Sequence, residues 1–185
     1  MRYVAFALAG ILLLSHVSAT QSRSKEEPSA KEIARLREVM SMPQDRSIIF
    51  VPSKELPDKN PLKVYALLIN KQQMFDPQEA TRGWVENWNS KNSAKYFPVE
   101  AAADISTADL IFLWFINPTI PDPAIVEQFG YNPLVVINSY LIVQKSTGAE
   151  IVWKHAGIGS VQRISRLTDK EFMERAKART KALKK

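Results

Sequence analysis

The sequence contains no cysteine, and this absence excludes several kinds of chemistry at once. The chain has no disulfide bond, no thiol nucleophile and no cysteine that a lipid could acylate. Structural zinc sites need four nitrogen or sulfur ligands, and the sequence offers only two histidines, His16 and His155. We therefore expect no bound metal and no other cofactor.

The apolar run at the N-terminus is too short for an ordinary transmembrane helix. Val4–Leu14 covers about 11 residues, whereas a helix that crosses a hydrocarbon core of ~30 Å needs about 20. Arg2 precedes the run, and Val17–Ala19 places small residues at the cleavage positions of a signal peptide. The sequence predicts a signal peptide over residues 1–19, cleaved after Ala19, and a periplasmic or secreted mature protein. A retained membrane anchor is the weaker alternative.

Acidic residues are missing from the C-terminal end of the chain. Residues 175–185 hold six lysines and arginines, whereas the rest of the mature chain carries 18 basic and 19 acidic residues. The net charge of +6 therefore describes a basic tail on a nearly neutral domain, which gives no electrostatic reason to expect a nucleic-acid partner. Cations at a helix C-terminus complement its macrodipole, so we expect at most weak electrostatic contact with an anionic membrane surface.

Two segments follow the predicted signal peptide. The mature chain begins with polar residues, and Ser29 and Glu32 then form a capping-box pattern at the start of a short amphipathic helix over 30–40. A proline-rich stretch separates this helix from the first long apolar run. We interpret residues 20–61 as an N-terminal tether with a helix, and residues 62–185 as an α+β domain.

A strong helix pattern lies between two apolar runs of strand length. Asp76 and Pro77 supply the N-cap and first-turn proline of a helix over 77–90. The runs at 63–70 and 109–116 are nearly continuous, as in strands that are covered on both faces. This order favours a right-handed crossover that joins parallel strands.

A hairpin and a final helix complete the predicted domain. Strands at 134–143 and 150–155 flank a turn with Gly148, and Thr168 and Glu171 predict a capping box that opens the last helix. Weaker strand-like runs lie at 48–51 and 96–99. The sequence thus predicts an α+β fold: a mixed β-sheet of four to five strands with one βαβ crossover, a C-terminal β-hairpin and helices mainly on one face.

The candidate binding residues come from a proline-rich loop and from the hairpin. Residues 117–133 contain four prolines and are long for a connection in a small domain, which is typical of a functional loop or a covering flap. Ile151 and Trp153 alternate with Val152 and Lys154 along their strand, so we expect the first two on one face. The other tryptophans are expected in the core. The candidate contacts to a ligand or partner are Trp153, Asp122, Glu127, Phe129 and Tyr131.

No group of residues forms a recognisable catalytic site. His155 is the only histidine after the predicted signal peptide, and Gly157–Ser160 lacks the lysine of a phosphate-binding loop. Asp104 and Asp109 flank a strand without an evident partner, although glycosidase-type hydrolysis needs only two carboxylates about 5–10 Å apart. We expect no catalytic residue, with a hydrolase that uses a pair of carboxylates as the alternative.

Three stretches of the domain resemble a family of bacterial envelope proteins of unknown function, many of them lipoproteins. The stretches are Thr107–Ile111, Asn138–Val143 and Lys145–Lys154. That family combines an Ala-Asp-Leu strand start with a Thr-Gly-x-x-x-Trp hairpin and a C-terminal helix, and the resemblance covers about residues 62–183. This chain departs from it by lacking the lipobox cysteine and by having Lys145 and Ser146 where an acid is usual. The resemblance implies an envelope location and brings no catalytic residues.

These observations together predict an exported, non-enzymatic binding or interaction module. Its partner would be an unknown envelope protein or a small ligand. An enzyme should gather acids with shifted pKa values in its main pocket, whereas a binding module should show an apolar or aromatic groove without them.

Overall fold

The computed structural model describes residues 27–70, 76–118, 123, 127, 135–159 and 161–183. The predicted signal peptide over residues 1–19 lies outside the described residues. The candidate residues Asp122, Phe129 and Tyr131 also lie outside them.

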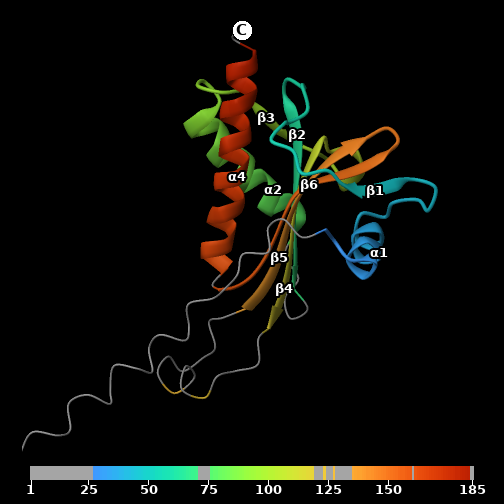
Figure 1. The fold of residues 1–185 in the computed structure, drawn as a ribbon. Helices are drawn as coiled ribbons and strands as arrows, with labels where there is room; N and C mark the ends of the chain where they lie inside the picture. Colours follow the sequence, from blue (N-terminus) through green and yellow to red (C-terminus); the bar gives the residue numbers. More distant parts are fainter. Residues whose placement is uncertain are drawn as a thin grey trace, which may run out of the picture.

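The described residues form a mixed six-stranded sheet with the strand order β1-β6-β5-β4-β2-β3 (Figure 1). In chain order, the elements are α1 (Ala30–Val39), β1 (Ser47–Phe50), β2 (Leu62–Asn70), α2 (Pro77–Asn92), β3 (Val99–Ala101), the 3-10 helix η1 (Ile105–Thr107), β4 (Leu110–Pro118), β5 (Val135–Lys145), β6 (Gly148–Gly159) and α4 (Val161–Ala182). The predicted α+β class with a mixed sheet is confirmed. The sheet has six strands because the short strands β1 and β3 also pair, one at each edge.

The crossover and the hairpin form where the sequence predicts them. β2 and β4 pair in parallel, with Val64 opposite Leu110 and α2 between the two strands in the chain. β5 and β6 are antiparallel, and the turn between them leads to Gly148. A Cβ atom at Gly148 would lie 2.2 Å from the backbone oxygen of Ser47, so only glycine lets β1 approach β6 here.

The N-terminal helix and first strand belong to the same sheet domain. β1 pairs in parallel with β6. Leu36 of α1 is fully buried in a core cluster with Ile111 and Ile142 from the centre of the sheet. The domain boundary that the sequence placed at residue 62 therefore falls between two strands of one sheet. The proline-rich stretch that suggested it is a connection inside the domain.

Neighbouring residues of the central strand β4 face two different cores. Phe112 packs with Trp88 and Phe172 on the side of α2 and α4, whereas Ile111 packs with Leu36 on the side of α1. This two-sided burial explains the continuous apolar run of β4. Two long helices cover one face of the sheet and the short α1 covers part of the other (Figure 1), in line with the predicted placement of helices mainly on one face.

A β-bulge separates two residues that the sequence placed on one face. The register shifts between Leu141 and Ile142 of β5, so that Trp153 pairs with Leu141 and Ile151 pairs with Ile142. The residue between, Val152, is the extra residue of a bulge, which breaks the alternation of side chains. Trp153 therefore lies in the core beneath α4 and Ile151 in the core beneath α1. The expectation that they share a face is wrong.

Helix α4 begins seven residues before the predicted capping box, at Val161 rather than Thr168. Thr168 is fully buried inside the helix, and its Oγ1 accepts a hydrogen bond from Nε1 of Trp114 at 3.1 Å. The prediction that Thr168 opens the helix is wrong because its hydroxyl bonds a strand tryptophan instead of capping the helix backbone.

Two arginines of the basic C-terminal segment point into the domain. Arg175 is 2% exposed and donates hydrogen bonds to the backbone oxygens of Ser53 at 2.8 Å and Val152 at 3.1 Å. Arg179 is also buried and donates to the backbone oxygen of Lys59 at 2.7 Å. Both arginines therefore hold the connection between β1 and β2 against α4, and their charges do not belong to a basic surface.

Candidate ligand-binding pocket

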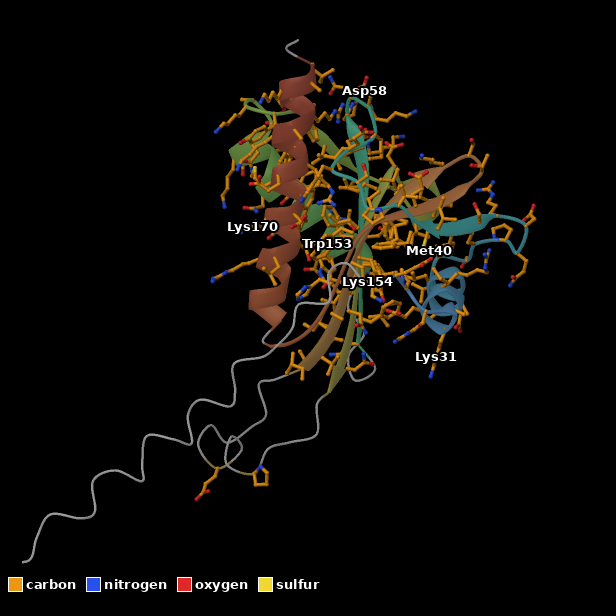
Figure 2. All side chains as sticks on the ribbon, viewed as in Figure 1. Lys31, Met40, Asp58, Trp153, Lys154 and Lys170 are labelled. Carbon is orange, nitrogen blue, oxygen red and sulfur yellow. The ribbon has the colours of Figure 1, made fainter. Side chains whose placement is uncertain are left out.

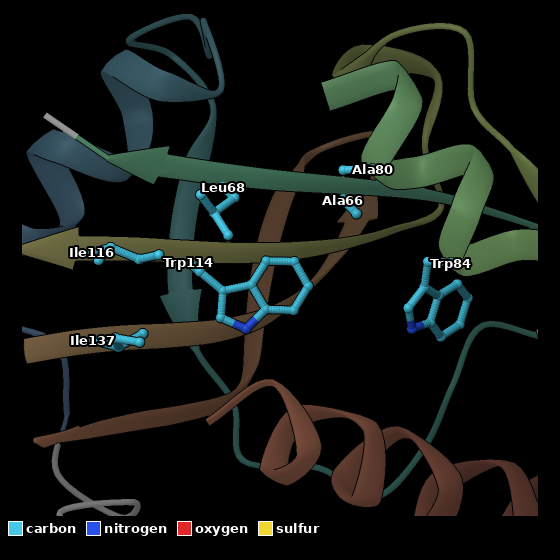
Figure 3. A pocket seen from close by; sticks show the side chains of 7 residues that line it. All are labelled: Ala66, Leu68, Ala80, Trp84, Trp114, Ile116 and Ile137. Carbon is cyan, nitrogen blue, oxygen red and sulfur yellow. The ribbon is translucent and has the colours of Figure 1, made fainter. Parts of the chain in front are cut away.

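An apolar pocket lies between α2 and the sheet (Figure 3). Its volume is about 200 Å³. The wall residues that the structure describes are apolar and come from β2, α2, β4 and β5: Ala66, Leu68, Ala80, Trp84, Trp114, Ile116 and Ile137.

Small side chains leave this space open where α2 crosses β2. Ala66 of β2 and Ala80 of α2 lie near each other at one end of the pocket (Figure 3). The buried Thr81 fixes the distance between the two elements, because its Oγ1 accepts a hydrogen bond from the backbone N of Ala66 at 2.9 Å and donates to the backbone oxygen of Pro77 at 2.6 Å. The helix is thus tied to the strand beside a gap that the two methyl groups do not fill.

Two tryptophans wall the pocket in fixed orientations. Nε1 of Trp84 donates a hydrogen bond to Oδ1 of Asp169, and Nε1 of Trp114 donates to Oγ1 of Thr168, each at 3.1 Å. The two acceptors are adjacent residues of α4, so one turn of that helix orients both indoles. Phe112 supports them from the sheet, with ring centroids 4.5 Å from Trp84 and 6.0 Å from Trp114. Because both N–H groups are used within the protein, the rings offer apolar surface to the pocket.

None of the described residues in the wall of the pocket has an ionisable side chain. Asp169, which bonds Trp84, has a pKa that burial raises although the hydrogen bond from Trp84 acts to lower it. Among the residues that the structure describes, no three histidine or carboxylate side chains gather as metal ligands. The described wall of the pocket therefore favours an apolar ligand.

The structure does not bring the described candidate residues into this pocket. Trp153 is only 9% exposed, and its ring stacks on His155 with centroids 5.9 Å apart. It lines a separate hollow beside Arg175. Glu127 is exposed and is not part of the apolar wall. The other candidates, Asp122, Phe129 and Tyr131, lie outside the described residues.

The two acids considered for hydrolysis bind backbone groups at the start of β4. The Asp104 carboxylate caps η1, and the hydrogen bond from the Ser106 hydroxyl lowers its pKa. Oδ2 of Asp109 accepts a hydrogen bond from the backbone N of Lys63 at 2.9 Å, which joins β4 to β2. These contacts give both carboxylates structural roles near the start of β4.

A buried polar cluster lies on the opposite face, beneath α1. The Lys154 side chain is 7% exposed, and its Nζ lies 2.8 Å from Oε1 of Glu32, which also accepts a hydrogen bond from the Tyr140 hydroxyl at 2.8 Å. Burial acts to raise the pKa of Glu32, but hydrogen bonds from Lys154, Ser29 and Tyr140 outweigh it and lower the pKa to about 2. The side chains of Lys154 and Trp153 thus lie on opposite faces of the sheet (Figure 2). The cluster attaches α1 to the sheet through one carboxylate.

The residues that form the apolar pocket were expected only as core residues. Trp88 is buried as expected, at 4% exposed, whereas Trp84 and Trp114 are half-buried and line the pocket. The sequence feature that could have indicated the pocket is the pair Ala66 and Ala80. Each is a small side chain among larger ones, and the two belong to elements that pack against each other, so space remains between them.

Fold and pocket together define an α+β domain with an apolar pocket beneath one helix. No protein-family model matches the chain, and no curated protein or solved structure is significantly similar to it. The resemblance to envelope proteins stays a prediction from the residues that carry it. Among the described helices, none has both the length and the apolar character needed to cross a membrane.

Proposed function

We propose that this protein is a binding module for a small apolar molecule, held between α2 and the sheet. The observation that carries the proposal is the pocket walled by Trp84 and Trp114: both of their N–H groups are engaged, and the other described residues of the wall are aliphatic. Such walls offer dispersion contacts and shed water on binding, without supplying a proton donor or a nucleophile.

The size of the pocket limits the ligand. An apolar protein cavity of about 150 Å³ holds a benzene ring, so the space of about 200 Å³ suits a substituted benzene or an acyl chain of similar bulk. A ligand of this kind needs no metal and no charged anchor. The N-terminal sequence pattern supports export, so we place this binding function in the periplasm or outside the cell.

A thermal-unfolding titration with toluene tests the proposal. A ligand that binds only the folded state raises the unfolding temperature in a saturable way, and we expect this for the parent protein. Ala80→Phe places a ring in the pocket wall at an exposed position of α2 and should remove the response. Ala178→Phe, at an exposed position of α4, is the matched control and should keep it. No saturable shift in the parent, or an equal shift in Ala80→Phe, would refute the proposal.

A further inference from the structure

A second groove lies between α2 and α4, on the side of Trp84 that faces α4. Its volume is about 190 Å³. The lining residues combine aromatic rings with amide and carboxylate groups: Trp84, Asn87, Trp88, Asn92, Asp169, Phe172 and Met173. This mixture differs from the wholly apolar wall of the first pocket.

Three aromatic rings form a rigid wall in the groove. Trp84 and Trp88 lie one helical turn apart and stack with centroids 5.9 Å apart and an interplanar angle of 9°. Phe172 meets both edge-on, at 5.1 Å from Trp84 and 4.7 Å from Trp88. The Trp88 N–H is also engaged, because Nε1 donates to the backbone oxygen of Phe97 at 3.0 Å. Trp88 is only 4% exposed and Phe172 is fully buried, so the half-buried Trp84 supplies most of the accessible aromatic surface of the groove.

Asp169 is a carboxylate of α4 without a cationic partner in the described part of the chain. Its hydrogen bond from Nε1 of Trp84 comes from a neutral donor. By contrast, Glu171 pairs with Arg175 at 2.7 Å, and Glu174 pairs with Lys177 at 2.8 Å on the same helix. Asp169 reaches the surface, and partial burial raises the pKa of its carboxyl, with no cation acting to lower it. A cation bound beside it would restore the balance.

We propose that the groove between α2 and α4 binds a small organic ammonium ion, with Asp169 as its counter-charge and the half-buried indole of Trp84, backed by Trp88, as its aromatic wall. Aromatic faces attract ammonium groups within about 6 Å of the ring centroid, and quaternary ammonium ions are bound in this way by aromatic cages. Asn87 and Asn92 also line the groove, and their side-chain amides are able to accept hydrogen bonds. The groove and the apolar pocket share Trp84 and no other lining residue among those that the structure describes, and their ligands are distinguished by charge.

Choline and 3,3-dimethylbutan-1-ol test this assignment, because they have nearly the same shape and differ by one positive charge. We expect choline to quench or shift the tryptophan fluorescence in a saturable way at constant ionic strength. The neutral alcohol should bind at least about five-fold more weakly, since it lacks the attraction to the rings and to the carboxylate.

Two variants of α4 separate the role of Asp169 from a general effect of charge. Asp169→Asn keeps an oxygen that accepts from Trp84, so the fold should persist, as circular dichroism can verify, while choline affinity falls at least about five-fold. Glu174→Gln removes another acid of the same helix and should leave choline affinity within about two-fold, because the carboxylate pairs with Lys177. Equal binding of choline and the alcohol, unchanged affinity in Asp169→Asn, or no choline binding at all would overturn the proposal. None of these outcomes decides whether the apolar pocket binds a ligand, because the toluene titration of the parent protein tests that proposal separately.

Discussion

Replacing Glu32 with glutamine should destabilise the protein because it leaves Lys154 charged and without its carboxylate in the interior. Lys154 is 5% exposed and Tyr140 is 1% exposed, and both bond Glu32. Removing one partner of a buried ion pair costs about 3–5 kcal/mol. The Glu32 side chain is 28% exposed, so water hydrates part of the site, and we expect a loss of about 2–3 kcal/mol in the free energy of unfolding.

Lys154→Met should cost less, about 1 kcal/mol or below, since it removes the buried charge and leaves Glu32 with its bonds to Ser29 and Tyr140. In the double variant the two losses should not add, because Lys154→Met relieves the cost of the uncompensated charge. Glu38→Gln, at an exposed position of the same helix, is the control and should change stability by less than about 0.5 kcal/mol.

The pH dependence gives the same prediction a second readout. Because the folded state lowers the pKa of Glu32 from 4.5 to about 2, its carboxylate contributes stability that is fully present above about pH 4.5 and is lost as the pH falls toward 2. Urea unfolding at pH 7 should therefore show the full difference between the parent and Glu32→Gln, and the difference should shrink toward pH 2. An equal free energy of unfolding at pH 7, or a larger loss in Lys154→Met than in Glu32→Gln, would refute the reasoning.

Three further predictions concern the hairpin and the C-terminal end. Gly148→Ala should lower the unfolding temperature, because the added Cβ would lie 2.2 Å from the backbone oxygen of Ser47; an unchanged temperature would mean that β1 does not pair with β6. Trp153→Ala should cost about 3–5 kcal/mol in urea unfolding, since the side chain is 9% exposed, and a loss below about 1 kcal/mol would show that the ring is accessible to ligand. Deleting residues 181–185 should leave the circular dichroism unchanged and weaken sedimentation with anionic vesicles only slightly, whereas strong binding by the parent in about 0.5 M salt, where charges are screened, would contradict a solvated helix end.

The sequence predicts those parts of the fold that depend on local patterns. The Asp76–Pro77 start of α2 and the apolar runs of β2 and β4 define the crossover, and the described helix and strands confirm it. The bulge at Val152 could not be predicted, because it depends on the register between β5 and β6 rather than on the composition of either strand.

The inward-facing arginines show a second limit of local patterns. Arg175 and Arg179 belong to a run of basic residues that is typical of a solvated helix end. In the structure they bond backbone oxygens of Ser53 and Lys59, which lie more than a hundred residues earlier in the chain. Only the packing of α4 against the connection between β1 and β2 decides that these charges are buried.

The position of the apolar pocket could not be predicted from the sequence. The candidate contact residues Trp153 and Glu127 lie elsewhere in the fold, and the other candidates lie outside the described residues. In the sequence, Trp84 and Trp114 have the pattern of core residues. The pocket beside them exists because the small side chains of Ala66 and Ala80 leave space between α2 and β2. The gap between α2 and β2 can be recognised only when the distance between the two elements is known.

The central claim, that a small apolar ligand lies between Trp84 and Trp114, is tested most directly by following the four tryptophan indole N–H signals in ¹H–¹⁵N spectra during a toluene titration. Single Trp→Phe variants assign the signals. We expect saturable shifts of the Trp84 and Trp114 signals, which belong to the walls of the pocket, and smaller changes for Trp153, which lies in a separate hollow. Shifts centred on Trp153, or no saturable shift of any indole signal, would contradict it.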